Sequence, residues 1–335
     1  MNNKKILLIG AGWYGCHIGL FLKKKGYKVD IFEKKKDIFL GASGYNQFRL
    51  HTGYHYPRSS ETIKETKKNF LKFKKLYKNF IFFPKNNIYC IAKQRSLIDS
   101  ATFKTILKGN KLKIVKKKFN FLRNIEDSYI SNEGVLLNEK IKKFYKKKLK
   151  ENIFYNQNVS DIKILEKKYD YIVDCSNTLF KNYLNENFNY ILTISLIYKK
   201  KKNSAVYPIT IMDGELPSLY PYADKKDLFT LTHSKYTHIK KFRHFSSLEK
   251  YKKNIKKVKI NEIKKKMEDD MKRFFPKFKK LLIYKDYFFS YKVLPNDNSS
   301  KRSTFIVKNN NTISCTSPKI TNIFSFESYI NNTIK

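Results

Sequence analysis

Cysteine is scarce in this chain, and its four copies lie far apart. They are Cys16, Cys90, Cys175 and Cys315. No two of them form a CxxC pair and no histidine stands at a zinc-ligand spacing, so the sequence predicts neither a disulfide framework nor a metal site. This cysteine usage suits a reducing compartment, and we expect a cytoplasmic protein.

The sequence also lacks a long hydrophobic run. The apolar stretch near the N-terminus covers about six residues, too few for a signal peptide and far too few to cross a membrane. We therefore expect no integral membrane segment. Hydrophobic residues still make up 41% of the 335 residues, which is enough for a real core in one large or two ordinary domains.

Acidic residues are few, and arginine is rare among the basic ones. The chain has 71 Lys and Arg residues against 28 Asp and Glu, a formal net charge of +43. Only seven of the 71 are arginine. Lysines are spread along the chain, and the favoured residues have A/T-rich codons, so base composition explains the charge more simply than nucleic-acid binding does. We expect no nucleic-acid partner, but a field that attracts anionic substrates.

Glycine is also scarce, and three of the 11 glycines stand in one short motif. The apolar run Lys4 to Ile9 is followed by Gly10, Gly12 and Gly15, then by an amphipathic segment and a second apolar run that ends at Glu33. This order predicts strand, glycine turn, helix and strand. It is the βαβ unit that binds the pyrophosphate of a dinucleotide at the start of its helix.

The spacing gives each residue of this unit an expected task. Gly10 permits the turn, Gly12 lets the backbone approach the phosphates, and Gly15 lets the helix pack on the strand. The carboxylate of Glu33 accepts hydrogen bonds from ribose hydroxyls and repels a 2′-phosphate, which disfavours NADP. The expected cofactor-binding residues here are Gly10, Ala11, Gly12, Trp13, Tyr14, Gly15, Glu33 and Lys34.

Further along, helical and extended segments alternate. Apolar spacing predicts helices over residues 61–80 and 138–152, a strand over 87–93, and a short helix over 96–107 capped by Ser96. The strand at Tyr169 to Ser176 suggests that the dinucleotide domain resumes after an insertion. From Tyr190, long alternating segments predict an antiparallel sheet with one buried face.

These elements predict an α/β protein with two interleaved domains. The Rossmann-like cofactor domain is discontinuous and comprises residues 1–85, 131–185 and 300–335. The inserted substrate domain has an α+β character, is built on the antiparallel sheet, and comprises residues 86–130 and 186–299. A hairpin over residues 309–311 and a closing helix over 318–330 complete the cofactor domain.

Three stretches resemble FAD-dependent oxidoreductases of the D-amino-acid-oxidase and glycine-oxidase superfamily. Gly41-Ala-Ser43 resembles the second phosphate-side loop of that family. Leu50-His-Thr-Gly-Tyr-His-Tyr-Pro57 is similar to the stretch of 2-hydroxyglutarate oxidases that carries a histidine near the flavin, and His51 falls on that histidine. Tyr169 to Thr178 resembles the late strand of the flavin domain, which ends in a small-residue turn.

The resemblance implies FAD as the cofactor, with two departures from the family pattern. The turn after the late strand has Asn177 where the family usually has glycine, and asparagine tolerates a positive φ better than most residues. The C-terminal flavin loop, normally glycine-rich, reads Cys315-Thr-Ser-Pro-Lys319. Lys319 and a helix start there would stabilise negative charge on reduced flavin. The resemblance adds these cofactor-binding residues: Ser43, Arg49, His51, Ser176, Ser317 and Lys319.

The implied chemistry is oxidation of a C–H bond next to a hydroxyl or amine, with the hydride accepted at the flavin N5. His51 is the first candidate to take the heteroatom proton, and His55 is the second. Either histidine could instead simply hydrogen-bond loop backbone or flavin phosphate. Arg302, after the long 281–293 strand, stands where the superfamily often has an arginine for the substrate carboxylate, although a surface arginine fits equally well.

Substrate contacts are expected from the loop and the sheet. Arg58 flanks the histidine loop and could grip a carboxylate, since guanidinium binds one bidentately. Tyr220, Tyr222 and His233 lie on the sheet expected to cover the flavin, although a core tyrosine is the commoner outcome.

Three functions remain open at this point. The leading one is an FAD-dependent oxidase or dehydrogenase of a small anionic hydroxy acid, amino acid or amino sugar. The others are a sugar-mutase-like FAD enzyme without net oxidation and a non-catalytic nucleotide-binding protein. The sequence leaves the substrate, the electron acceptor, covalent flavin attachment and the oligomeric state open.

Overall fold

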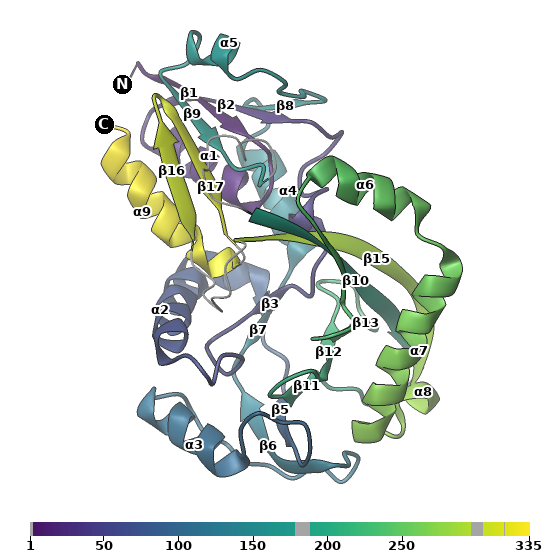
Figure 1. Ribbon diagram of the computed structural model, residues 1–335. Helices are drawn as coiled ribbons and strands as arrows, with labels where there is room; N and C mark the ends of the chain where they lie inside the picture. The colour runs from purple at the N-terminus through teal and green to yellow at the C-terminus, as the bar shows by residue number, and fades with distance from the viewer. Residues whose placement is uncertain (1–2, 178–187, 296–303, 318) are drawn as a thin grey trace.

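A six-stranded sheet carries the N-terminal βαβ unit. It stands at the top of Figure 1, which shows a computed structural model describing residues 3–177, 188–295, 304–317 and 319–335. The sheet order is β16-β17-β9-β1-β2-β8, and all neighbours are parallel except the antiparallel β16–β17 pair. Its strands are β1 (Lys5–Ile9), β2 (Lys28–Glu33), β8 (Ile153–Tyr155), β9 (Tyr171–Asp174), β16 (Phe305–Asn309) and β17 (Thr312–Thr316).

The first helix packs closely on this sheet because it has a glycine at the point where it crosses β2. Helix α1 (Trp13–Lys24) buries Ile18 and Leu22. A Cβ on Gly19 would come within 2.7 Å of Ile31 Cδ1, so a glycine is needed for the close approach. The strands of this sheet come from three distant parts of the chain, which confirms the predicted discontinuous Rossmann-like fold.

A larger sheet forms the second layer and is mixed, not purely antiparallel as predicted. Its order is β14-β10-β13-β12-β11-β5-β6. Strand β15 stands outside this order and also pairs with β10. One pair, β5 with β11, is parallel. The strands are β5 (Asn87–Ala92), β6 (Ile125–Ser131), β10 (Phe188–Lys200), β11 (Ile209–Met212), β12 (Pro217–Pro221), β13 (Leu228–His233), β14 (His238–Phe242) and β15 (Leu282–Pro295).

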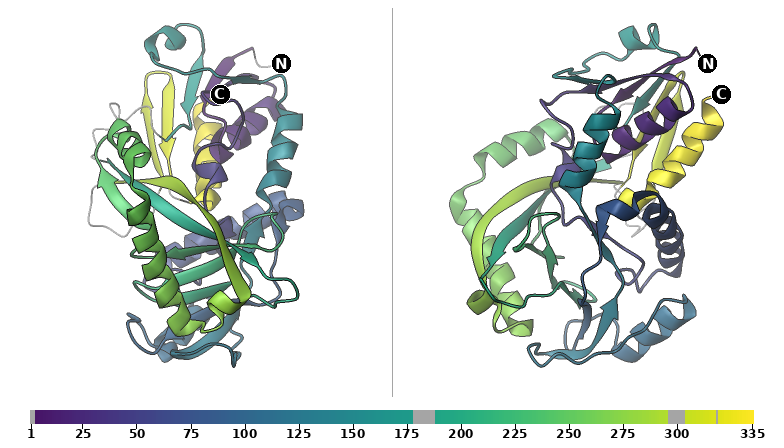
Figure 2. Two further views of the ribbon diagram at one scale, coloured as in Figure 1. Left: turned by 90° about the vertical axis from the view of Figure 1, so that its right-hand side faces the viewer. Right: turned by 180° about the vertical axis from the view of Figure 1, so that it is seen from behind.

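Helices cover one face of the larger sheet. Helix α7 (Lys257–Phe274) buries Met267 and Met271 in the same core as Leu219 and Leu231 of the sheet. Figure 2 shows α6, α7 and α8 following the long β10–β15 pair down the side of the molecule. The bounds are α6 (Phe245–Asn254) and α8 (Phe278–Leu281). Helix α3 (Ser100–Gly109) is separate from this group and lies at the β5–β6 end of the sheet (Figure 1).

A small sheet and several helices join the two layers. The small sheet has the order β3-β7-β4. Strand β3 leads directly into the stretch Leu50 to Pro57, which we call the histidine loop. The connecting strands are β3 (Arg49–Leu50), β4 (Ile81–Phe82) and β7 (Gly134–Leu136), and the helices are α2 (Ser60–Tyr77), α4 (Asn138–Lys148), α5 (Lys163–Glu166) and α9 (Ile323–Thr333), with 3-10 turns η1 (Ala42–Gly44), η2 (Lys78–Phe80) and η4 (Ile320–Asn322).

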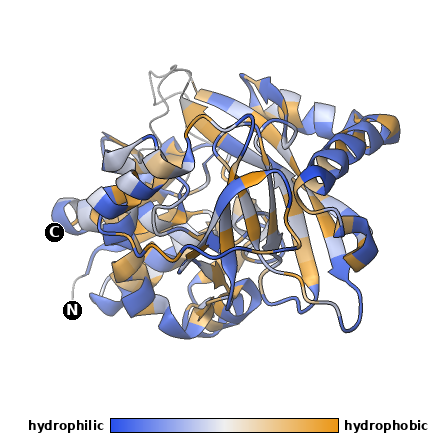
Figure 3. Ribbon diagram, turned by 90° about the horizontal axis from the view of Figure 1, so that it is seen from below, coloured by the Kyte–Doolittle hydropathy of each residue, from blue (hydrophilic) through white to orange (hydrophobic). Residues whose placement is uncertain are grey.

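Hydrophobic residues concentrate on the strands and hydrophilic ones on the outer helices, as Figure 3 shows. Among the residues that the structure describes, no helix has both the length and the apolar character needed to span a bilayer. The predicted domain boundaries near residues 185 and 299 fall outside the described residues, and the division into two interleaved domains stays a prediction.

Candidate cofactor and active site

The glycine turn after β1 has the close contacts that its sequence predicted. Gly10 has a φ of +95°, which favours glycine, and a Cβ there would lie 3.2 Å from the Ser176 Cα. A Cβ on Gly15 would lie only 1.9 Å from the Gly10 carbonyl oxygen. The helix therefore starts directly against the turn, and its first amides face the carboxyl end of β1.

Glu33 closes the turn from the neighbouring strand. One of its carboxylate oxygens accepts a hydrogen bond from the Ala11 amide at 2.8 Å, and the other accepts one from the Lys35 amide at 2.9 Å. The side chain is mostly buried and borders a cavity. Glu33 thus stands at the end of β2 beside the glycine turn, and its role as the ribose acceptor stays a prediction.

Ser43 meets the start of α1 from the second loop. Its hydroxyl accepts a hydrogen bond from the Trp13 amide at 3.0 Å. A Cβ on Gly12 would lie 2.9 Å from the same oxygen, so glycine leaves the hydroxyl room to reach the helix. The first turn of α1 contains no acidic residue, and the positive end of the helix dipole is available to an anion.

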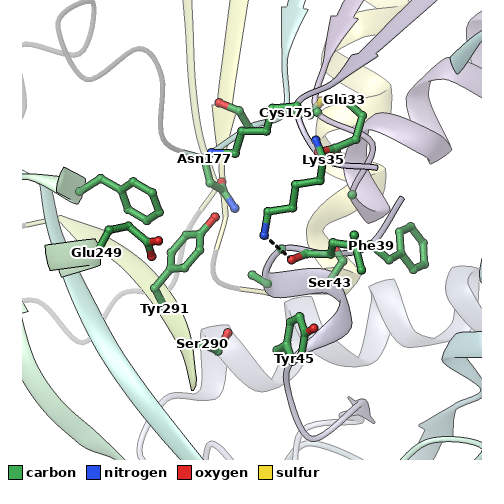
Figure 4. Close-up of a pocket in the computed structure, with 18 of the residues that line it drawn as sticks. Glu33, Lys35, Phe39, Ser43, Tyr45, Cys175, Asn177, Glu249, Ser290 and Tyr291 are labelled. Atoms are coloured by element: carbon green, nitrogen blue, oxygen red, sulfur yellow. Dashed lines mark hydrogen bonds between the residues drawn. The ribbon is translucent and has the colours of Figure 1, made fainter. Parts of the chain in front are cut away.

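A cavity of about 580 Å³ runs along these groups. Figure 4 shows Glu33, Lys35 and Ser43 on one side and Glu249 and Tyr291 on the other. The far wall comes from the inserted segment, with Leu192 of β10, Ser290 of β15 and helix α6. The volume lies in the range of small-molecule and cofactor sites.

The turn after β9 forms another wall of this cavity. Ser176 and Asn177 line it. Asn177 has a φ of 62°, so the asparagine adopts the left-handed conformation expected of it. Asp174, at the end of β9, is fully buried and accepts a hydrogen bond from the Ser176 amide at 2.8 Å. Burial raises the pKa of this carboxyl to about 6, against the lowering effect of hydrogen bonds from Ser176 and Ser314.

Lysines line the cavity at the end of β2. Lys34 lies with its ammonium 5.5 Å from the ring centre of Phe245, which joins the end of β2 to α6. Burial, with Lys34 and Lys252 nearby, lowers the pKa of Lys35. Lys34 thus borders the cavity as expected, and Lys35 lines it as well.

The histidine loop forms a second cluster that is not among the residues lining the cavity. The rings of His51 and His55 stack with centroids 4.9 Å apart, and Tyr56 packs edge-on to both. The ammonium of Lys319, from the C-terminal loop, lies 4.6 Å from the Tyr56 ring centre. Residues more than 250 positions apart in the sequence therefore meet at this loop.

Glu133 holds the base of this cluster and was not among the site residues predicted from the sequence. Its buried carboxylate lies 3.1 Å from His51 Nδ1 and accepts from the Thr52 amide at 2.9 Å. Burial acts to raise the pKa of Glu133, but the charge and hydrogen bond of His51, together with Arg49 and Tyr89, lower it to about 2. The available signal was an isolated acid between β6 and β7, in a chain with only 28 acids.

The two arginines that flank the loop have different surroundings. Arg49 is buried, and its guanidinium donates to Tyr89, Thr210 and Ser218 and stacks on Tyr220. It ties the loop to the larger sheet and does not line the cavity. Arg58 is largely exposed and pairs with Asp213 at 2.5 Å.

The remaining predicted residues divide between the two faces of the larger sheet. Tyr220 and Tyr222 are buried on the face toward the histidine loop, in the hydrophobic core that also contains residues of β1, β2 and α1. His233 lies on the opposite face of the sheet from Tyr220 and Tyr222. Side chains alternate along β13, so it points with Leu231 toward α7, where Nε2 lies 2.8 Å from an Asp270 oxygen. Arg302 lies outside the described residues.

Trp13, Tyr14 and Ser317 serve the packing around the cofactor turn. The indole of Trp13 is buried against Phe39 and donates to Asn138 at 3.3 Å, while its backbone amide faces Ser43. The Tyr14 hydroxyl donates to the Lys319 carbonyl at 2.7 Å. Ser317 accepts from Thr304 at 3.1 Å, so these side chains fix the C-terminal loop beside α1.

Known proteins share this fold and much of this sequence. The sequence profile of the FAD dependent oxidoreductase (DAO) family matches residues 5–282, and the chain belongs to that family. The FAD-dependent monooxygenase FPY4 of Fusarium mangiferae is 27% identical over 333 residues, covering 97% of this chain and 89% of the relative. The FAD-dependent monooxygenase kojA of Aspergillus flavus is 25% identical over 354 residues, covering 95% and 83%.

Solved structures show the same fold at low sequence identity. Glycine oxidase from Bacillus cereus superposes with a TM-score of 0.72 at 13% identity, covering 99% of this chain and 96% of that one. L-α-glycerophosphate oxidase from Mycoplasma pneumoniae, with FAD bound, gives 0.71 at 13% identity, covering 100% and 96%. Both confirm the predicted fold class.

The residues fit an FAD dinucleotide. Gly10, Gly12 and Gly15 leave the space that side chains would fill, Ser43 and the first amides of α1 would hold the phosphates, and Glu33 would hold the ribose. The chain is an FAD-dependent oxidoreductase of this family. When bound, the cofactor supplies a two-electron acceptor.

Proposed function

We propose that this protein oxidises a small anionic hydroxy acid, amino acid or amino sugar, with the substrate hydride accepted at the flavin N5. The observation that supports this most is the His51 cluster beside the C-terminal loop. It offers an imidazole to take a proton and the ammonium of Lys319 to hold an anion. His51 would accept the proton of the substrate hydroxyl or amine, with His55 stacked against it.

The anionic end of the substrate would be held by positive charge near the loop. Lys319 lies beside Tyr56, and the net charge of +43 draws anions toward the whole surface. Tyr220 and Tyr222 are proposed to form the substrate side of the larger sheet, and Arg302 stays a candidate carboxylate ligand.

The test is anaerobic mixing of the FAD-bound protein with a panel of 2-hydroxy acids, 2-amino acids and amino sugars. Bleaching of the visible flavin absorbance without another reductant identifies a substrate. We expect His51→Ala to keep its FAD but to reduce it about 10²- to 10⁴-fold more slowly, the usual contribution of a general base. His238→Ala, on the exposed edge strand β14, is the matched histidine control. Undiminished reduction in His51→Ala would refute this role.

A monooxygenase is the second candidate, because FPY4 and kojA carry that name and match nearly the whole chain. Its flavin would be bleached by NADH or NADPH, and oxygen would then enter an organic substrate. Bleaching by a reduced nicotinamide and by no member of the panel would favour this candidate. No flavin spectrum in the purified protein would exclude both candidates.

A further inference from the structure

The turn between β6 and β7 places one carboxylate under the histidine loop. The side chain of Glu133 is fully buried, and each of its contacts is a donor or a histidine nitrogen. One oxygen accepts from the Thr52 amide at 2.9 Å. The other receives the Tyr89 hydroxyl at 2.5 Å, His51 Nδ1 at 3.1 Å and Arg49 Nη2 at 3.5 Å.

The chemistry of this contact determines which nitrogen of His51 carries the proton. An ionised carboxylate can only accept hydrogen bonds, so the imidazole nitrogen facing Glu133 must donate. In the neutral ring, Nδ1 therefore holds the hydrogen and Nε2 holds the lone pair. Stacking on His55, at an interplanar angle of 23°, also fixes the plane of the ring.

We propose that Glu133 is the positioning residue of the active site, which fixes the tautomer and orientation of His51 so that Nε2 can accept the substrate proton. The inference rests on the proposed function, because a fixed Nε2 lone pair matters only if His51 acts as the base. When His51 becomes an imidazolium, the same carboxylate stabilises it. Arg49 balances the charge of Glu133 while His51 is neutral, so the buried pair adds no net charge.

The chain contains a second buried histidine–carboxylate–arginine cluster that serves as a matched control. His233 Nε2 lies 2.8 Å from an Asp270 oxygen, and Arg95 binds the same carboxylate at 2.8 and 2.9 Å. This cluster lies between β13 and α7, on the face of the sheet turned away from the histidine loop. Asp270→Asn therefore tests the structural cost of losing such a carboxylate without touching His51.

Glu133→Gln is the informative change, because the amide keeps the size of the carboxylate but not its charge. An amide has one oxygen and one NH₂. If the oxygen faces the Thr52 amide, the NH₂ opposes the donors of His51 and Arg49. If the amide is reversed, the NH₂ opposes Thr52. In the first orientation His51, Tyr89 and Arg49 lose their shared acceptor, and in the second Thr52 loses its acceptor. Both orientations remove the negative charge beside His51.

The first experiment needs no substrate. Ring ¹⁵N NMR of histidine-labelled, FAD-bound protein reports the tautomer of each of the six histidines, and His51→Ala assigns the His51 signals. We expect a single Nδ1–H tautomer in the native protein and in Asp270→Asn, and its loss or a mixture in Glu133→Gln. An unchanged His51 spectrum in Glu133→Gln, or an Nε2–H tautomer in the native protein, would overturn the proposal.

The second experiment uses a panel member that bleaches the flavin. We expect Glu133→Gln to slow reduction about 10- to 100-fold, the size usual for a residue that orients a catalytic group. The acidic limb of the pH profile should move to lower pH, because the carboxylate no longer favours the imidazolium. In the His51→Ala background, Glu133→Gln should have no further effect on the rate, since the two residues act as a unit.

The outcomes separate the two proposals. An equal loss from Glu133→Gln with and without His51 would mean that Glu133 does not act through His51, and would refute the positioning role alone. Full reduction by His51→Ala would refute the base role in the proposed function, whatever the NMR shows. Asp270→Asn should keep the rate, and a similar loss in that variant would identify the Glu133 effect as general destabilisation.

Discussion

At the scale of single residues, two buried acids respond to their surroundings in opposite ways. Asp174 is buried with hydrogen bonds but no cation, and its pKa rises to about 6. Glu133 is buried beside a histidine and an arginine, and its pKa falls to about 2. Burial is the largest single effect in both cases, and the partner charges decide the direction.

The raised pKa of Asp174 predicts how its replacement changes stability with pH. Its pKa in the unfolded chain is about 3.8 and in the folded chain about 6, so folding favours the protonated form. Stability from this group is fully present below pH 3.8 and is lost as the pH rises to about 6, by about 3 kcal/mol at most. We expect Asp174→Asn to gain stability relative to the native protein over this window and to keep that gain above it.

Urea unfolding of both proteins from pH 4 to 8 checks this expectation. The comparison removes the contribution of other groups, Glu133 among them, which acts with the opposite sign below pH 4.5. A stability difference that does not change between pH 4 and 8 would show that folding does not raise the pKa of Asp174. The side-chain amide introduced by Asp174→Asn can still accept from the Ser176 amide, so the geometry of the turn is retained.

At the scale of elements, the contact between α1 and β1 depends on one missing methyl group. The Cβ of an alanine at position 15 would lie 1.9 Å from the Gly10 carbonyl oxygen, which is backbone and cannot turn aside. We expect Gly15→Ala to shift the start of α1, to abolish FAD retention and to cost several kcal/mol, as overpacking of a rigid site does.

Gly109→Ala is the matched control for that change. Gly109 is the last residue of α3, and a Cβ there meets nothing within 4 Å. This variant should keep its FAD and its melting temperature, or gain slightly, because alanine is the better helix former. The flavin-to-protein absorbance ratio of the two purified variants measures the difference. Full FAD occupancy in Gly15→Ala would contradict the close packing described here.

The sequence predicted the elements better than it predicted their ends and partners. The glycine turn, Glu33 and the left-handed Asn177 follow from local backbone requirements, so they can be read from one stretch of sequence. Helix α3 was expected to be capped by Ser96, but Asp99 is the cap and accepts from Thr102 at 2.6 Å. Both residues are good caps, and only the tertiary contact of Ser96 with the Asp213 amide distinguishes them.

Long-range partners account for the other differences. The parallel β5–β11 pair and the orientation of His233 toward α7 depend on which elements become neighbours. Alternation within one strand cannot reveal those neighbours. Glu133 was missed for the same reason. Its role appears only when residues 49, 51, 52 and 89 converge on it.

At the scale of the whole molecule, the cofactor cavity belongs to both layers. Strands of the six-stranded sheet form one wall, and β10, β15 and α6 form the other. A ligand bound here requires both layers to be folded, so we expect FAD to stabilise the entire chain. At a free concentration 100 times its dissociation constant, FAD should add about 2.7 kcal/mol.

Thermal unfolding at several FAD concentrations tests this linkage. Fluorescence of Trp13, the single tryptophan, reports the cofactor layer, and far-ultraviolet circular dichroism reports the whole chain. Both transitions should move upward together as FAD increases. A Trp13 transition that rises while the circular-dichroism transition separates from it would show that the two layers unfold independently.

The order of strands in the six-stranded sheet also has a consequence for biosynthesis. Strand β17, residues Thr312–Thr316, pairs with β9, which in turn pairs with β1. The glycine turn is translated before β9 and β17, so its sheet stays incomplete until β17 has been translated. Nascent chains thus carry the glycine turn without its finished sheet through the synthesis of the inserted segment, and we expect flavin capture to follow the translation of β17.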